Sequence, residues 1–353
     1  GELLQLAFFR SAKISNTANR TSQSKKRGLG EMNQSTHAEK VTVQAAAGSI
    51  QGRVKNGALL FAGIPYAKAP VGSLRFRPPQ PLAGFAEPYP ALKFSPAAPQ
   101  IPSGGMTDNA PVRWSEDCLY LNISAPVEAL EANDSGDRAV MVWIHGGGYT
   151  SGQGAIPWYN GNRFAKNNDI VVVSINYRLG ALGFADLTNL GEEFATSNIN
   201  GTLDQIAALK WVQDNIAAFG GDPSRVTIAG ESAGGFSVAT LMACPSAEGL
   251  FQQAIPQSGA CHHTLPQEAS KKVTEHFLGE LGLNSAIELE AASAEDILAA
   301  QKATTAYFSQ GAGQVNSLGV AVSPFYPVHG NTTLPEDPLT AARNGASDTV
   351  RVL

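Results

Sequence analysis

The chain has 353 residues, of which 43% are hydrophobic and 16% are charged, and its formal net charge is −5. This acidic balance argues against a nucleic-acid partner, since proteins that bind nucleic acids carry basic patches. No apolar run approaches the ~20 residues of a membrane-spanning helix. The composition agrees with a soluble enzyme, of a length that α/β folds reach as one unit.

Residues 1–40 are predicted to be a disordered or non-native extension. The chain begins with Gly rather than Met, and residues 11–40 are rich in Ser, Asn, Thr, Lys and Gln without any period. The short apolar run at 3–9 precedes its basic residues, which is the reverse of a secretory signal and argues against secretion. Met32 is a candidate for the natural start, and the folded domain is expected to cover residues 41–353.

From residue 41 onwards, strands and helices are predicted to alternate. Residues 41–43 and 49–54 are expected to form a hairpin, and residues 203–219 predict a helix with one apolar face. Core strands are predicted near residues 118–124, 139–144, 170–176, 226–229, 253–257 and 349–353. Such alternation is typical of an α/β fold, with a mostly parallel central sheet and helices on both faces.

A glycine triplet follows the predicted strand at 139–144. Residues 145–148 read His-Gly-Gly-Gly, and three glycines after a core strand let the backbone turn its N–H groups outward. Acyl transfer needs such donors, because the carbonyl oxygen becomes an anion in the tetrahedral intermediate. Taken alone, the triplet is also consistent with a flexible turn.

Residues 230–234 read Gly-Glu-Ser-Ala-Gly and follow the apolar run at 226–229. This G-x-S-x-G pattern is typical of a nucleophile elbow, in which the serine sits on a sharp strand-to-helix turn. Small residues flank Ser232 because a larger side chain would crowd that turn. A helix is expected at 233–242, and the N–H of Ala233 is expected to complete an oxyanion hole with the glycine loop.

With these motifs the chain resembles the type-B carboxylesterases of the α/β-hydrolase fold, which include cholinesterases and bacterial para-nitrobenzyl esterases. The resemblance covers nearly everything from Val41 to Leu353. Further strings that carry it lie at residues 61–67, 74–76, 115–122, 176–180, 204–209, 211–212, 215–216, 219–223 and 257–259. It implies a serine hydrolase that cleaves small-molecule carboxylic esters through an acyl-enzyme, without a metal or organic cofactor.

By this resemblance Ser232 is the nucleophile. Glu231 matches an acidic residue that tunes the active-site field, and Ser258 matches a buried serine that supports the catalytic triad. The oxyanion-hole positions are matched by Gly147, Gly148 and Ala233.

Two further sets of residues are expected to surround this site. Arg75 and Glu116 match a structural ion pair, which we expect to be scaffold because buried charges need partners. Trp114, Trp158 and Phe236 are predicted to line the substrate pocket, although each aromatic ring is also consistent with ordinary core.

The other two triad members are expected beyond Leu353. α/β-Hydrolases place the acid and then the histidine after the serine, and residues 348–353 resemble the start of the strand that precedes the acid. The chain is therefore predicted to be incomplete at its C-terminus and to lack the triad acid and histidine. His329 is the internal alternative for the histidine. An inactive fragment and a non-catalytic carboxylesterase-like binding module are the alternatives to an active esterase.

Cysteine usage bears on the compartment. In secreted animal relatives the match of Cys118 is bridged to a cysteine in a Cys-Pro-Gln string, and the corresponding residues 98–100 read Ala-Pro-Gln here. That bridge cannot form, and three cysteines, with Cys244 and Cys261, are an odd number. A cytoplasmic protein of microbial origin is therefore predicted, with Cys118 as a small buried hydrophobic residue. The natural ester and the oligomeric state are not predicted.

Overall fold

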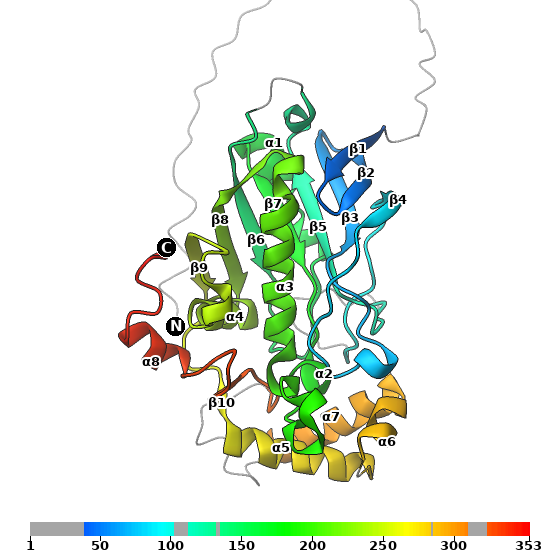
Figure 1. Cartoon of the computed structure of the whole chain (residues 1–353), viewed down its shortest axis with the longest axis vertical. Helices are drawn as coiled ribbons and strands as arrows, with labels where there is room; N and C mark the ends of the chain where they lie inside the picture. The colour runs from blue at the N-terminus through cyan, green and yellow to red at the C-terminus, as the bar shows by residue number, and fades with distance from the viewer. Residues whose placement is uncertain (1–38, 102–111, 132–134, 284, 310–322) are drawn as a thin grey trace, which may run out of the picture. The chain divides into compact units, whose positions relative to one another are not determined.

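The computed structural model describes residues 39–101, 112–131, 135–283, 285–309 and 323–353 (Figure 1). The strands are β1 (Lys40–Ala45), β2 (Gly48–Lys55), β3 (Ala58–Pro65), β4 (Phe85–Pro90), β5 (Tyr120–Ala125), β6 (Arg138–Ile144), β7 (Val171–Ile175), β8 (Gly221–Glu231), β9 (Gln253–Gln257), β10 (Leu265–Pro266), β11 (Val328–His329) and β12 (Arg351–Val352). The α-helices are α1 (Asn162–Asn168), α2 (Gly180–Phe184), α3 (Asn200–Asn215), α4 (Ala233–Met242), α5 (Gln267–Leu281), α6 (Ala286–Ala291), α7 (Ala294–Ser309) and α8 (Pro338–Arg343).

One large mixed sheet forms the centre of the described domain. Its order is β1-β2-β3-β5-β7-β6-β8-β9-β12, with β4 beside β2, while β10 and β11 form a separate pair. Neighbours from β1 to β7 are antiparallel, and those from β7 to β12 are parallel. The predicted parallel sheet is thus found in one half only. Turns of two residues join β1, β2 and β3, and such short turns permit only antiparallel pairing, whereas parallel neighbours need a crossover.

Helices cover both faces of the sheet, as the sequence predicts (Figure 1). A side chain on Gly161, the residue before α1, would lie 2.6 Å from Val172 of β7. A side chain on Gly221 would instead meet Val140 of β6 and Ile216, which directly follows α3. Val140 pairs with the residue before Val172, and alternate residues of a strand point to opposite faces. α1 and α3 therefore lie on opposite faces.

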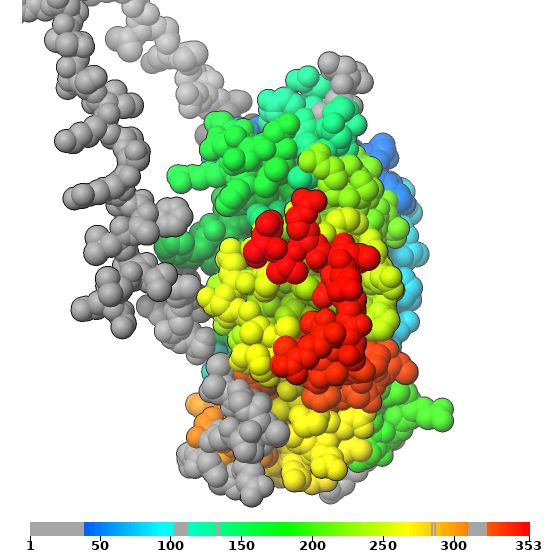
Figure 2. Space-filling model, turned by 90° about the vertical axis from the view of Figure 1, so that its left-hand side faces the viewer, coloured from blue at the N-terminus to red at the C-terminus, as the bar shows by residue number. Residues whose placement is uncertain are grey.

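Most predicted elements are present, with small differences at their ends. The hairpin of β1 and β2 is confirmed, as is the helix at 233–242. The helix predicted at 203–219 begins earlier, at Asn200, and its last turn is a 3-10 helix over Ile216–Phe219. The strand predicted at 349–353 is present as the short β12, which pairs in parallel with β9 at the edge of the described sheet. Figure 2 shows this C-terminal segment, in red, on the outside of the molecule.

The predicted scaffold ion pair is confirmed. Arg75 Nε donates to Glu116 Oε2 at 2.6 Å, and Arg75 Nη2 donates to Glu116 Oε1. Arg75 Nη1 also donates to the carbonyls of Glu290 and Ala292, at the end of α6. A guanidinium with this many acceptors is fixed in place, so the pair holds α6 against the segment that contains Arg75.

The structure describes most of the folded domain predicted at residues 41–353 but little of the predicted N-terminal extension. The extension predicted over residues 1–40 lies outside the described residues, except for residues 39 and 40, and Lys40 begins β1.

Cys118 and Cys244 are buried and Cys261 is half-buried, all three as free thiols. Burial raises the pKa of the Cys118 thiol, which agrees with its predicted role as a small hydrophobic residue. In the described ranges, no helix has the length and apolar character to cross a membrane.

Candidate active site

The glycine loop and the elbow are brought together because their strands are neighbours. Ile144, the last residue of β6, pairs with Gly230 of β8 in parallel register. Both chain segments therefore leave the sheet at the same edge. A Cβ added to Gly146 would lie 3.3 Å from the Cβ of Ser232 and only 2.6 Å from the carbonyl oxygen of Glu231. Only glycine permits this approach, so the loop residue matters to the elbow as much as the elbow's own glycines do.

Ser232 adopts the sharp turn that the G-x-S-x-G pattern predicts. Its φ is 56° and its ψ is −122°. Residues other than glycine rarely adopt this backbone conformation, so the surrounding contacts must enforce it. Its N–H donates to the Gln257 carbonyl at 2.9 Å, and its carbonyl accepts from the Phe236 N–H at 2.8 Å. A Cβ on Gly234 would lie 2.1 Å from the Ile144 carbonyl oxygen. The strand–turn–helix arrangement of an elbow is therefore present.

Three backbone N–H groups around Ser232 are available to a ligand. Gly147 and Gly148 have φ of 116° and 62°, and their N–H groups make no hydrogen bond to any residue that the structure describes. The Gly147 carbonyl, by contrast, accepts from the N–H groups of Thr150 and Ser151 at 3.0 Å. Ala233 is the first residue of α4, so its N–H has no acceptor within the helix. Unused donors beside a serine are suited to an oxyanion.

A buried hydrogen-bond network links the glycine loop to α4. Ser237 Oγ donates to the Ala233 carbonyl at 2.9 Å and accepts from Gln205 Nε2 at 2.9 Å. The Tyr149 hydroxyl lies 3.3 Å from the same Oγ. Because the single hydrogen of Ser237 is directed to Ala233, Tyr149 supplies the hydrogen of that bond. Tyr149 directly follows Gly148 and itself has a φ of 59°, so this network fixes the loop against the helix that carries the elbow.

The start of the loop is fixed separately by a pair of stacked rings. The ring of His145 lies on the ring of Tyr177, with centroids 4.5 Å apart. Tyr177 donates its hydroxyl to the His145 carbonyl at 2.9 Å, and His145 Nδ1 is 2.9 Å from the Gly146 carbonyl. Burial lowers the pKa of His145 to about 4. This histidine is thus neutral near neutral pH and serves the loop as a structural group.

Glu231 lies against the glycine loop, as its place beside Ser232 requires. Its Oε2 would be 3.3 Å from a Cβ on Gly146. Burial raises the pKa of Tyr159, and the negative charge of Glu231 raises it further. The ring of Tyr159 contacts that of Trp143, with centroids 5.1 Å apart. An acidic and a phenolic group therefore share one side of the elbow.

The three predicted pocket aromatics lie in different surroundings. Phe236 is 8% exposed and stacks on His263 with ring centroids 3.4 Å apart, one helical turn after Ser232. Trp114 is half-buried in a segment that bridges to Ala97. Trp158 is 78% exposed and lines a surface hollow to which no residue of the elbow contributes. Only Phe236 is tied to the elbow by a described contact.

Ser258 differs from the expectation. It follows β9 with a φ of 49°, and its side chain is exposed rather than buried. Beyond β9 the sheet of the described residues continues only with the short β12, so no packed element covers this position. Ser258 is thus exposed among the described residues, and its supporting role stays a prediction.

No histidine of the described residues is hydrogen-bonded to the Ser232 hydroxyl. That hydroxyl makes no hydrogen bond within the described part of the chain, and its residue is half-buried. His329, the internal alternative, has its Nδ1 3.0 Å from Thr264 Oγ1. Burial lowers the pKa of His329, and Asp337 opposes this shift. A histidine occupied in this way is not placed as the base of Ser232.

Sequence reasoning missed the residues that hold the loop. Tyr149, Ser237 and Gln205 were not singled out, although Ser237 interrupts the apolar helix predicted at 233–242. A buried hydroxyl in such a helix needs partners, and this was the available signal. Gln100 was missed too: its side-chain amide exchanges two hydrogen bonds with the backbone of Gly152. Among the described residues, no three His, Cys, Asp or Glu side chains are grouped as a metal site would require.

The chain is similar in sequence to known proteins. A sequence model of the family described as "Carboxylesterase family" matches residues 39–353. Para-nitrobenzyl esterase of Bacillus subtilis (strain 168) is 41% identical over 310 residues, which are 87% of this chain and 60% of that protein. Phenmedipham hydrolase of Pseudarthrobacter oxydans is 38% identical over 305 residues, 83% of this chain and 57% of that protein.

Solved structures give the same result for the fold. A structure titled "PNB esterase" superposes with a TM-score of 0.77 at 39% identity, covering 88% of this chain and 62% of that one. A thermophilic PNB esterase gives a TM-score of 0.78 at 39% identity, with the same coverage. The predicted α/β-hydrolase fold is confirmed by this likeness. The chain spans about 60% of the length of the relatives named here.

Proposed function

This chain belongs to the carboxylesterase family, and on that premise we propose that it hydrolyses carboxylic esters through an acyl-enzyme on Ser232. The observation that carries the proposal is the approach of Gly146 to the elbow, where a Cβ would lie 3.3 Å from that of Ser232. It brings a strained serine and unused backbone N–H groups to one edge of the sheet. The intact serine and glycine loop favour an esterase over a non-catalytic binding module.

The proposed reaction begins with attack of Ser232 Oγ on the ester carbonyl. The carbonyl oxygen becomes an anion that the N–H groups of Gly147, Gly148 and Ala233 stabilise, and each such donor is typically worth ~2.7–4 kcal/mol. The alcohol leaves, and water then releases the acid from the acyl-enzyme. The serine proton passes to a histidine that an acid orients, and neither partner is identified among the described residues. Amides and carbamates are proposed as lesser substrates.

Glu231 and Phe236 are proposed to shape the site around this reaction. Glu231 contributes negative charge beside the glycine loop, where it also raises the pKa of Tyr159. Phe236 offers an apolar wall one turn after Ser232. Trp114, Trp158 and Ser258 remain predictions, because no described contact joins them to Ser232. We also propose a reducing, cytoplasmic location, supported by three free thiols of which two are buried.

A fluorophosphonate probe tests the nucleophile directly. In a protein that carries the triad histidine and acid as well, we expect covalent labelling at Ser232, located by peptide mass spectrometry, and complete loss of labelling in Ser232→Ala. Ser258→Ala, a matched change at the other serine that follows a strand with a positive φ, should keep the label. Labelling that persists in Ser232→Ala, or that maps to another residue, contradicts the proposal.

A further inference from the structure

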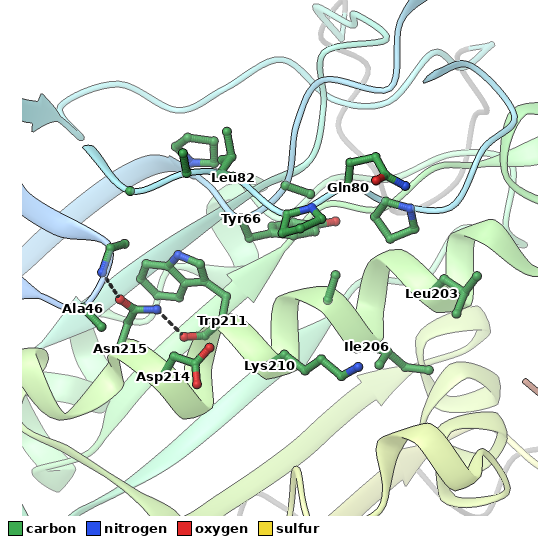
Figure 3. Close-up of a pocket in the computed structure, with 18 of the residues that line it drawn as sticks. Ala46, Tyr66, Gln80, Leu82, Leu203, Ile206, Lys210, Trp211, Asp214 and Asn215 are labelled. Carbon is green, nitrogen blue, oxygen red and sulfur yellow. Dashed lines mark hydrogen bonds between the residues drawn. The ribbon is translucent and has the colours of Figure 1, made fainter. Parts of the chain in front are cut away.

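One groove of the described domain lies away from the elbow. It has a volume of about 720 Å³ and lies between α3 and the segment 78–85, which leads into β4 (Figure 3). No residue of the elbow or the glycine loop lines it. Sites for small molecules commonly have volumes of ~300–1,000 Å³ with apolar walls and a few polar groups. The groove therefore has the size of a ligand site separate from Ser232.

The walls of this groove are apolar because their polar groups are already used. Tyr66 donates its hydroxyl to the Asn176 carbonyl at 2.7 Å. Asn215 accepts from the Ala47 N–H at 2.7 Å and donates to the Trp211 carbonyl at 2.8 Å. What remains is a hydrophobic surface of aromatic, proline and aliphatic side chains, which includes the 39% exposed Leu82 on the side opposite α3. Covering such a surface with a hydrocarbon is favourable, because apolar area is removed from water.

Two charged side chains of α3 lie along the same groove. Lys210 and Asp214 are exposed, and neither has an ion pair or hydrogen bond within the described residues. Figure 3 shows the Lys210 side chain directed toward Ile206, with Asp214 beside Asn215 further along the helix. Helical side chains lean toward the N-terminus of their helix, so the ammonium lies at the Ile206 end. A cation with free donors thus borders the apolar wall.

We propose that this groove binds a monocarboxylate with an apolar body, its carboxylate at Lys210 and its hydrocarbon between Trp211 and Leu82. The charges select this class. Lys210 attracts a carboxylate at its end of the groove, and Asp214 repels the second charge of a dicarboxylate that follows the groove. The ligand class follows from the groove alone, so the proposal goes beyond the proposed ester hydrolysis and does not depend on it. Carboxylic acids are also what an esterase releases, so a product of the proposed reaction fits the groove.

Direct binding by isothermal titration calorimetry, with the full chain, tests the proposal. Octanoate is expected to bind more tightly than octan-1-ol, and octylammonium more weakly than either. Lys210→Gln is expected to weaken octanoate about two- to fivefold, as for an exposed ion pair, and to leave octan-1-ol unchanged. Lys272→Gln, a matched change at an exposed lysine of α5, should have no effect.

A second variant tests the path of the hydrocarbon. Leu82→Asp places a negative charge on the exposed side of the groove without opening the core, and it is expected to weaken octanoate more than tenfold. Octanoate affinity that neither Lys210→Gln nor Leu82→Asp changes would place the acid elsewhere, at Ser232 for example, and would overturn the proposal. Equal affinity for octanoate and octylammonium overturns it as well. Because no turnover is measured, failure here leaves the proposed esterase activity standing.

Discussion

Two serines leave neighbouring strands with a left-handed backbone, and their surroundings differ. Ser232, after β8, has a φ of 56°, and Ser258, after β9, has a φ of 49°. Near Ser232 the chain segments lie so close together that only glycine fits at positions 146 and 234. The second is exposed. The comparison teaches that an unusual backbone does not itself make a reactive serine. Enclosure and unused amide donors do, and only Ser232 has both.

The largest expected effect comes from removing the hydroxyl group of each serine in turn. In a protein that carries the triad histidine and acid as well, Ser232→Ala is expected to lower kcat on the order of 10⁶-fold, because the members of a triad act as a unit. Ser258→Ala, in exposed surroundings, is expected to lower kcat less than tenfold. Steady-state kinetics with para-nitrophenyl acetate measures both. Similar losses in the two variants would remove the distinction between the two serines.

The enclosure of Ser232 is tested at Gly146. A methyl group there would lie 2.6 Å from the Glu231 carbonyl oxygen, so Gly146→Ala must displace the loop or the elbow. We expect kcat to fall ~10²–10³-fold, the usual effect of losing an oxyanion donor. Gly279→Ala, where an added Cβ has no heavy atom within 4 Å, is the matched control. An active Gly146→Ala would show that the loop is free to shift.

The buried, neutral histidine at the start of the glycine loop predicts that the folded chain loses stability in acid. The pKa of His145 is about 4 in the folded chain, against 6.5 for an unperturbed histidine. As the pH falls from 6.5 to 4, the unfolded chain takes up a proton that the folded chain does not, so stability is lost in that window. The contribution amounts to about 3 kcal/mol. His145→Gln should flatten this part of the pH dependence in urea unfolding, whereas exposed His262→Gln should leave it unchanged.

The smallest expected effect comes from the network behind the loop. Tyr149→Phe removes the hydroxyl that reaches Ser237 and leaves the packing in place. We expect kcat to fall about fivefold with KM unchanged, since one neutral hydrogen bond contributes about 1 kcal/mol. Tyr120→Phe, whose hydroxyl bonds Asp117 instead, is the control. A change in KM alone would indicate that Tyr149 acts on substrate binding and not on the loop.

The parts of the site that the sequence predicts are those set by local backbone chemistry. Gly-x-Ser-x-Gly after an apolar run determines the elbow, and the following helix ends where it was expected, at Met242. The ion pair of Arg75 and Glu116 is predicted by the resemblance to the carboxylesterases, and the structure shows it.

The exposure of a side chain and its contacts with distant segments do not follow from the neighbouring residues in the sequence. Predictions of these properties fail or were not made. The exposure of Ser258 depends on what packs beside β9, which no pattern around Ser258 states. Trp158 follows the glycine loop in sequence, yet 78% of its surface faces solvent. The bond of Tyr149 to Ser237 joins segments that only the tertiary fold brings together.

The pairing of Ile144 with Gly230 has a consequence for how this protein tolerates change in length. The segment between β6 and β8 includes the glycine loop, β7 and α3, but residues inserted into a connection outside these elements leave the β6–β8 pairing in place and the distance from Gly146 to Ser232 unaltered. A slip of β8 by a single residue against β6 would instead carry the serine out of reach of the loop and turn its strand's side chains to the wrong face. Duplications and deletions should therefore accumulate in those connections and be rare within the two strands and the glycine loop.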